Sequence, residues 1–143
     1  MYPVLHPGDV VLFDRLAYAD AQPVRGEIAV FEHPSAPSGR MLKIVAGLPG
    51  ERLEVGRDRL WINDRELLYS RPMVGSLPGR WVLGRNQFFM LSAAVAVGTD
   101  SRSFGAVSGE MILGRAWFLL RPTPRAGRIP RVPLTLRESS EKA

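Results

Sequence analysis

One internal lysine is the strongest candidate for acid–base chemistry in this chain. Only two of the 19 basic residues are lysines, Lys43 and Lys142, and the rest are arginines. Lys43 lies in an apolar run, between Leu42 and Ile44, where a charge is costly. Burial lowers the pKa of a lysine, and a neutral amine can act as a general base, which arginine cannot. The alternative is structural: the stem follows the core and the ammonium reaches solvent or a carboxylate.

The other residues with chemical potential form weaker patterns. His6 and His33 each stand beside a proline in a loop-like context, so neither predicts a catalytic triad or a metal site. Asp100, Ser101 and Arg102 are adjacent, and the simplest interpretation is an Asp100–Arg102 ion pair on one strand face. The absence of cysteine excludes disulfides, a cysteine nucleophile and cysteine-based zinc sites. We therefore expect no metal and no cofactor.

Short strands must position these residues. The 14 glycines and 12 prolines interrupt the chain often, which favours short strands and turns over long helices. Helical periodicity is weak, and the helix candidates are residues 92–97 and the last ten residues. We predict a mainly β fold. Apolar runs bounded by glycine, proline or charge predict strands at 9–13, 27–33, 41–48, 80–84, 87–91 and 111–120, with a hairpin over 52–64 that turns at Gly56, Arg57 and Asp58.

The strand that contains the lysine should expose different residues on its two faces. Successive side chains of a strand alternate between faces. Met41, Lys43 and Val45 would then share one face, and Leu42 and Ile44 the other. The ammonium of Lys43 would lie between two apolar neighbours.

Composition indicates one globular domain with a basic end. The chain has 143 residues, of which 45% are hydrophobic and 23% charged, as in an ordinary protein with a buried core. No run of 18 apolar residues and no signal peptide is evident, so we expect this chain to be soluble, with no transmembrane segment. We assign residues 1–122 to the domain and 123–143 to a basic tail rich in proline and arginine.

The charge of the chain points to anionic surfaces. Its net charge is +5, and residues 121–137 contribute five arginines among four prolines. The simplest interpretation of this stretch is a solvated, loosely ordered tail, and contact with lipid headgroups is the second. Nucleic-acid binding is not expected, because no aromatic residues alternate with these arginines.

Four segments, in order and with compatible spacing, resemble motifs of the type I signal peptidases, peptidase family S26. Residues 1–18 resemble the opening box, Ser-Met-x-Pro-Thr-Leu followed by Gly-Asp and a hydrophobic strand. Residues 24–34 are similar to the Arg-Gly-Asp-Ile-Val-Val-Phe strand, and 42–55 to the box Lys-Arg-x-x-Gly-Leu-Pro-Gly-Asp. Residues 88–116 resemble the last box, Gly-Asp-Asn-x-x-x-Ser-x-Asp-Ser-Arg with Phe-Gly and Gly-Arg-Ala. The hairpin end, 60–64, resembles Leu-x-Ile-Asn-Gly.

This resemblance implies the coiled antiparallel-sheet fold of signal peptidase I and LexA-like serine–lysine peptidases. It also implies a serine endopeptidase that removes signal peptides or propeptides after small-x-small motifs, usually Ala-x-Ala. In the family a serine attacks the carbonyl while a neutral lysine takes its proton, and Lys43 matches that lysine. The residues that match walls of the pockets for small substrate side chains are Met1, Leu5, Val30 and Leu42. Those that match the supporting part of the last box are Asp100, Ser101 and Arg102.

The chain departs from the family motifs in three places. The nucleophile corresponds to the residue directly before Met1, and an oxyanion-hole hydroxyl to a position two residues earlier still. The Gly-Asp-Asn of the last box reads Ser92-Ala93-Ala94, and the serine that binds the lysine corresponds to Gly98. The arginine after the family lysine is Ile44, which leaves Asp100 with Arg102 as its motif partner.

Several accounts of the missing serine stay open. A start placed one residue late would remove the serine together with a membrane anchor. The full-length protein would then be a monomeric protease on the extracytoplasmic face of the cell membrane, with a secreted preprotein or propeptide as substrate and its basic surface facing lipid. The chain beginning at Met1 would be inactive. The alternatives are a non-catalytic homologue that serves as a binding module, a maturation protease for a single partner, and, least favoured, a LexA-type repressor, because no helix-turn-helix pattern is present.

Overall fold

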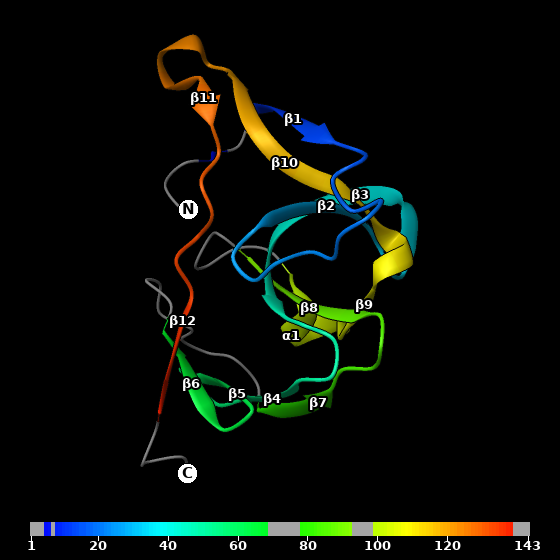
Figure 1. The fold of residues 1–143 in the computed structure, drawn as a ribbon, viewed down its shortest axis with the longest axis vertical. Coiled ribbons are helices and arrows are strands. Elements are labelled where there is room, and N and C mark those ends of the chain that lie inside the picture. The colour runs from blue at the N-terminus through cyan, green and yellow to red at the C-terminus, as the bar shows by residue number, and fades with distance from the viewer. Residues whose placement is uncertain (1–4, 7, 69–77, 93–98, 139–143) are drawn as a thin grey trace.

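Two antiparallel β-sheets make up most of the molecule (Figure 1). The computed structural model describes residues 5–6, 8–68, 78–92 and 99–138, apart from the side chains of 36–38. The seven-stranded sheet has the order β1 (Val10–Asp14), β10 (Ile112–Arg121), β2 (Ile28–His33), β3 (Ala36–Gly47), β8 (Gln87–Leu91) and β9 (Val107–Ser108), and β11 (Gly127–Arg128) also pairs with β10. The five-stranded sheet has the order β12 (Thr135–Glu138), β6 (Arg65–Leu68), β5 (Leu60–Ile62), β4 (Arg52–Val55) and β7 (Gly79–Val82).

The predicted β fold is confirmed, and each strand predicted from an apolar run is present. The hairpin forms as β4 and β5, around the predicted turn. The helices are short: α1 (Ser101–Phe104) and the 3₁₀ turns η1 (Gly109–Met111) and η2 (Thr123–Arg125). Within the described ranges, no helix has the length and apolar character needed to cross a membrane.

The alternation predicted for β3 is confirmed by its packing. Leu42 and Ile44 pack in one apolar cluster, together with Val30 of β2. Met41 and Val45 pack in a second cluster on the other face. β3 lies between β2 and β8 in the middle of the seven-stranded sheet, which explains why apolar residues occupy both of its faces. Lys43 directly precedes the buried residues 44–47 of this strand.

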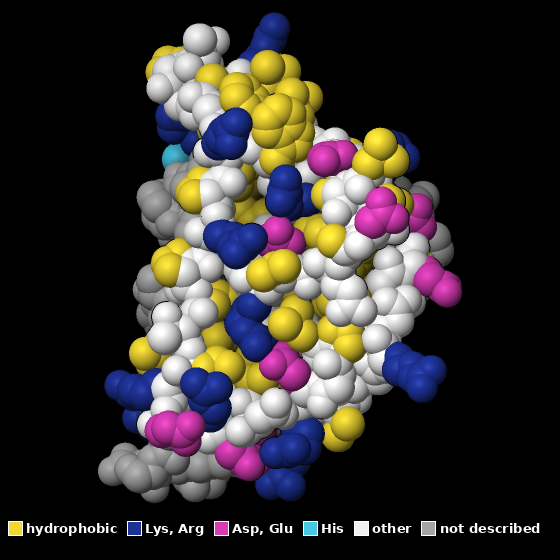
Figure 2. Space-filling model, viewed as in Figure 1, with side chains coloured by type: hydrophobic (Ala, Val, Ile, Leu, Met, Phe, Trp, Pro, Cys, Tyr) yellow, Lys and Arg dark blue, Asp and Glu magenta, His cyan; other side chains and the backbone are white. Residues whose placement is uncertain are grey.

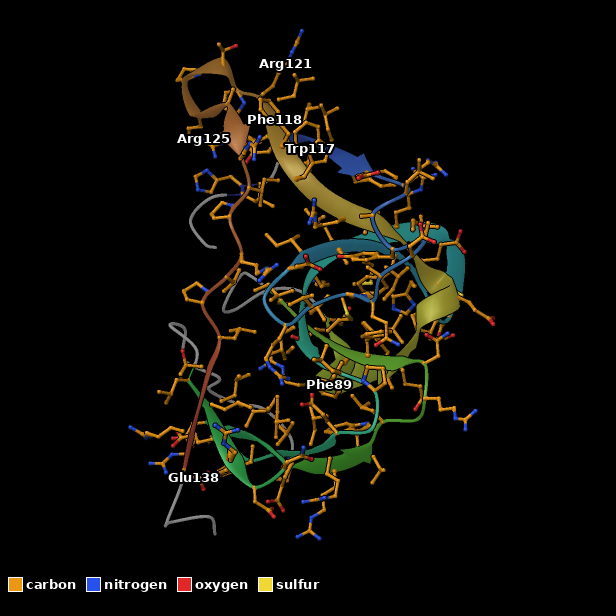
Figure 3. The ribbon with its side chains drawn as sticks, in the orientation of Figure 1. Phe89, Trp117, Phe118, Arg121, Arg125 and Glu138 are labelled. Carbon is orange, nitrogen blue, oxygen red and sulfur yellow. The ribbon has the colours of Figure 1, made fainter. Side chains whose placement is uncertain are left out.

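Phe89 of β8 joins the two sheets (Figure 3). Its fully buried ring packs in the same cluster as Leu53 and Ile62 of the five-stranded sheet. The ring also lies against Trp81 of β7, with 5.0 Å between the centroids. The five-stranded sheet is thereby packed against the strand that ends beside Lys43.

The prediction of a loosely ordered tail is wrong for residues 123–138, although most of these residues are exposed, as a solvated segment requires. This segment follows one side of the molecule from β11 to β12 (Figure 1), and these strands pair with β10 and β6. Val132 is 3% exposed, and its backbone N–H donates a hydrogen bond to the carbonyl of Gly26 at 2.8 Å. The basic composition suggested loose order, but carboxylates of the domain form ion pairs with the arginines of this segment. The pairs are Arg125 with Asp9, Arg131 with Glu27, and Arg137 with Glu66.

The helix predicted for the last ten residues is also wrong where it is described, because Thr135–Glu138 form β12. Pairing with β6 supplies the backbone hydrogen bonds that a short isolated helix could not retain. The other helix candidate, 92–97, lies outside the described residues except for Ser92.

Candidate active site

Lys43 lies between β2 and β8, the two neighbours of β3. Ala29 of β2 is its cross-strand partner, and the adjacent residue Ile44 is paired with Leu91 of β8. Lys43 is half-buried, and its Nζ donates a hydrogen bond to Oγ of Ser92 at 3.1 Å. Ser92 directly follows β8 and is 4% exposed. The amine is therefore held against a hydroxyl in a largely desolvated setting.

The surroundings of Lys43 favour the neutral amine. Burial lowers the pKa of Lys43 below its ordinary value of 10.5. The charge of Arg102 acts in the same direction, and the carboxylate of Asp100 opposes both. The net shift is downward, as a general base requires.

Asp100 connects this amine to the start of α1. Its carboxylate is 1% exposed and accepts a hydrogen bond from the backbone N–H of Ser92 at 2.9 Å. It also accepts the backbone N–H of Arg102 at 3.0 Å and the guanidinium Nη2 at 2.7 Å. The predicted ion pair forms, but its predicted position on a strand face is wrong, because Asp100 caps the N-terminus of α1.

The hydrogen bonds around Asp100 keep it ionised. Burial raises the pKa of this carboxyl, but the hydrogen bonds from Arg102 and from the N–H of Ser92 outweigh burial. The pKa of Asp100 therefore lies below its ordinary value of 3.8. The ionised Asp100 therefore holds the backbone of Ser92, and the side chain of Ser92 accepts the hydrogen bond from Lys43.

Ser101 anchors the same segment from another side. It is fully buried, and its Oγ accepts a hydrogen bond from the backbone N–H of Met90 on β8 at 2.8 Å. The Asp-Ser-Arg sequence thus fastens α1 to the end of β8, next to Ser92.

The residues expected to line substrate pockets are brought together where they are described. Leu5, Val30 and Leu42 belong to one apolar cluster, and Val30 and Leu42 are cross-strand partners. Val30 is 8% exposed, whereas Leu5 and Leu42 are half-buried. Met1 of the expected pocket wall lies outside the described residues, as do Ala93, Ala94 and Gly98 of the last box.

Several cavities of the described residues, of about 230 to 690 Å³, lie elsewhere. One of about 690 Å³ surrounds the turn between β4 and β5, and one of about 230 Å³ lies where β2, β10 and the segment after β11 meet. None of them is lined by Lys43 or Ser92. We therefore take the polar network around Lys43, and not the size of a cavity, as the mark of the site.

The role of Ser92 is the part of the site that the sequence did not reveal. In the family motif, the position of Ser92 is a glycine, and the hydroxyl partner of the lysine stands at the position of Gly98. The contact between Lys43 and Ser92 follows from the pairing of β3 with β8, which brings together two residues 49 positions apart in the sequence. Such non-local register is not encoded in a local pattern.

Comparison with known proteins shows the family of the chain. The sequence model of the family described as signal peptidase, peptidase S26, matches residues 1–120. A probable signal peptidase I-2 from Synechocystis is 28% identical over 136 residues, which cover 89% of this chain and 62% of the relative. A mitochondrial ATP-independent inner membrane protease subunit 1a from Arabidopsis thaliana is 28% identical over 125 residues, covering 87% and 66%. The chain thus spans a little under two thirds of either relative.

A solved structure shows the same fold. The crystal structure of a signal peptidase I from Enterococcus faecalis superposes with a TM-score of 0.56 at 23% identity. The superposition covers 66% of this chain and 96% of that one. The coiled antiparallel-sheet fold expected from the motifs is confirmed.

Proposed function

Because the chain belongs to the signal peptidase family, peptidase S26, we propose that it carries the catalytic region of a membrane-associated serine endopeptidase. Its reaction is the removal of signal peptides or propeptides from secreted proteins, by cleavage after small-x-small motifs such as Ala-x-Ala. The observation that carries the proposal is the half-buried amine of Lys43, whose Nζ lies 3.1 Å from a buried hydroxyl.

Lys43 acts as the general base in this reaction. Its neutral amine takes the proton of a serine hydroxyl while the serine oxygen bonds to the carbonyl carbon of the substrate. The same proton then passes to the nitrogen of the leaving peptide, and the acyl-enzyme forms. A water molecule repeats the sequence and releases the acid. The lowered pKa of Lys43 supports this role, since it increases the neutral fraction at a given pH.

The serine of this reaction is, by the motif, the residue directly before Met1. Ser101 is poorly suited to the role, because its buried Oγ already accepts the N–H of Met90. On this proposal the chain that begins at Met1 does not cleave peptides, and the missing chemistry is restored by a serine at that position.

The apolar cluster that contains Leu42, the residue before Lys43, suits small substrate side chains. Leu5, Val30 and Leu42 are packed with Val11 and Phe13 of β1. A wall of closely packed aliphatic and aromatic side chains offers a methyl-sized group contact and excludes a larger one. This favours alanine at the two recognised positions of the substrate.

The outer part of the β1–β10 ribbon supports association with a membrane surface. Val10, Leu12, Trp117 and Leu120 are each 40% to 44% exposed on these strands. Figure 2 shows apolar side chains gathered at this end of the molecule with arginines around them, and Figure 3 places Trp117, Phe118 and Arg121 along β10. Exposed aromatic and aliphatic groups ringed by arginines suit an anionic lipid surface. The inward residues of β1 pack against the expected substrate wall, so the ribbon would hold the site near the bilayer.

The cleavage test compares two extended chains. One carries Ser-Gly-Ser directly before Met1, which supplies the nucleophile and the earlier hydroxyl of the motif, and the other carries Ser-Gly-Ala. We expect the first to cleave a peptide with an Ala-x-Ala site and to leave a Leu-x-Leu peptide intact, and the second to cleave neither. If the Ser-Gly-Ser chain folds but does not cleave the peptide, the result would contradict the peptidase proposal and favour a non-catalytic binding role.

A further inference from the structure

We propose that Ser92 is a positioning residue for Lys43, whose hydroxyl holds the lysine amine in the direction needed for proton transfer. The catalytic meaning of this contact rests on the proposed peptidase function. The contact itself is a property of the chain, and it can be tested without any cleavage.

The sheet register brings the two residues together. Residues 44 and 45 of β3 pair with Leu91 and Met90 of β8. Continued by one residue, the same register sets Lys43 opposite Ser92. Side chains directly opposite each other in an antiparallel pair project to the same side with Cβ atoms about 5 Å apart. The Nζ–Oγ hydrogen bond of 3.1 Å is therefore a cross-strand contact that the fold imposes.

Two further contacts hold the hydroxyl in place. The backbone N–H of Ser92 donates to Oδ2 of Asp100, and that carboxylate is itself held by the guanidinium of Arg102. Ser101, the first residue of α1, accepts the backbone N–H of Met90 and so binds this helix to β8. Because Ser92 is anchored through its backbone, its side chain can hold Lys43 without moving with it. The lysine side chain has several rotatable bonds, so its amine can take many positions. A fixed hydrogen-bond acceptor at the end of the side chain reduces that freedom.

The sequence around Ser92 agrees with this role. The motif position that supplies a lysine-binding hydroxyl is occupied by Gly98, which has none. Ser92 stands where the motif has glycine. Relative to the motif, this segment lacks one hydroxyl, at Gly98, and has another, at Ser92, which contacts Lys43 in the structure.

Ser92 is better suited to positioning than to nucleophilic attack. A nucleophile must bring its oxygen to a substrate carbonyl, whereas Ser92 is 4% exposed and its backbone is bound to Asp100. The same lysine contact would nevertheless fit a serine–lysine pair within the chain. Cleavage by the unextended chain is therefore one outcome of the test.

NMR spectroscopy of the 143-residue chain tests the contact. With [¹³Cε]lysine labelling the two lysines give two sets of signals, and Lys142→Arg identifies that of Lys43. A held amine gives different shifts for its two Hε protons. We expect this difference in the unchanged chain, its loss in Ser92→Ala, and its retention in Ser92→Thr, which keeps the hydroxyl. Ser103→Ala, an exposed serine of α1, is the matched control and should change nothing. Two distinct Hε shifts that persist in Ser92→Ala would overturn the proposal.

Kinetics of the Ser-Gly-Ser chain test what the contact does. We expect Ser92→Ala to lower kcat about tenfold with KM unchanged, far less than the ~10²–10⁴-fold contribution of a general base. An unchanged kcat would overturn the positioning role. Ser92-dependent cleavage by the unextended chain would overturn it too, because Ser92 would then be the nucleophile. If the unchanged Ser-Gly-Ser chain is inactive, the peptidase proposal fails, and the Hε shifts still decide whether Ser92 holds Lys43.

Discussion

Asp100 and Arg102 are joined by both main chain and side chain at the start of α1. The backbone N–H of Arg102 donates to Oδ1 of Asp100 at 3.0 Å, and Nη2 donates to Oδ2 at 2.7 Å. The second oxygen also accepts the N–H of Ser92. One buried carboxylate therefore sets the position of the helix and of the residue that contacts Lys43.

Asp100→Asn should destabilise the fold more than it changes the chemistry. Loss of the charge leaves a partly buried guanidinium with a weaker partner, which costs about 3 kcal/mol of unfolding free energy at neutral pH. Because the pKa of Asp100 is lowered in the folded protein, its contribution is present above the ordinary value of 3.8 and is lost as the pH falls through the folded value. Urea unfolding between pH 2 and pH 7 measures this dependence.

The exposed Asp58 in the β4–β5 turn provides the control for this experiment. Asp58→Asn should leave the free energy of unfolding within about 0.5 kcal/mol of the unchanged chain. Equal stability of the Asp100→Asn protein and the control at pH 7 would show that the ion pair does not stabilise the fold.

The strands were predictable because their signal is local. The runs that became β2, β3 and β8 are apolar and bounded by glycine, proline or charge, and the turn at Gly56 separates the arms of the hairpin. The unusual setting of Lys43 could also be recognised locally, since Leu42 and Ile44 flank it.

The parts that were not predictable depend on contacts between distant residues. The contact of Ser92 with Lys43 depends on the pairing of β3 with β8, which the local sequence does not show. The order of the segment after β10 depends likewise on a contact between distant residues, Val132 and Gly26. The Asp100–Arg102 pair was recognised, but its place on a helix cap was not, because α1 spans only four residues. Short helices and strand register have little local signal.

Gly26→Ala should loosen the segment after β11. Gly26 has φ +95°, and a Cβ there would overlap the carbonyl oxygen of Val132. Left-handed backbone and overlap together should cost about 3 kcal/mol. Gly50→Ala is the matched control, since Gly50 has φ +83° with open space around it, and should cost about 1 kcal/mol.

Thermal unfolding and limited trypsin digestion at Arg128 and Arg131 measure the effect of Gly26→Ala. We expect a lower Tm and faster cleavage than in Gly50→Ala. Identical digestion of the two variants would mean that the contact with Val132 does not hold the segment.

Trp117→Ser should weaken binding to anionic vesicles. Trp117 is 40% exposed on β10, whereas Trp61 is 6% exposed and Trp81 is half-buried against Phe89. An emission shift on adding phosphatidylglycerol vesicles would therefore report mainly on Trp117. We expect a several-fold lower partition coefficient for Trp117→Ser in vesicle sedimentation. Val82→Ser removes an apolar side chain that is 75% exposed on β7, in the other sheet, and should have no effect. Equal losses for both variants would argue against a lipid-facing ribbon.

Lys43→Met should stabilise the folded chain near neutral pH. The pKa of Lys43 is lowered by folding, so the folded state binds the proton less well than the unfolded state. The resulting penalty is fully present below the folded pKa and disappears as the pH rises to the ordinary value of 10.5. The Tm of Lys43→Met should therefore exceed that of the unchanged chain at pH 7, and the difference should narrow towards pH 10.5. A lower Tm at pH 7 would contradict this assignment of the penalty.

The pKa of Lys43 tests the central claim most directly. In a [¹³Cε]lysine-labelled Lys142→Arg chain, a single lysine signal remains, and its shift can be followed with pH in the folded protein and in urea. We predict that the folded pKa of Lys43 lies below that in urea and below 10.5. A folded pKa equal to the urea value, or above it, would leave the amine protonated at neutral pH and would contradict Lys43 as the general base.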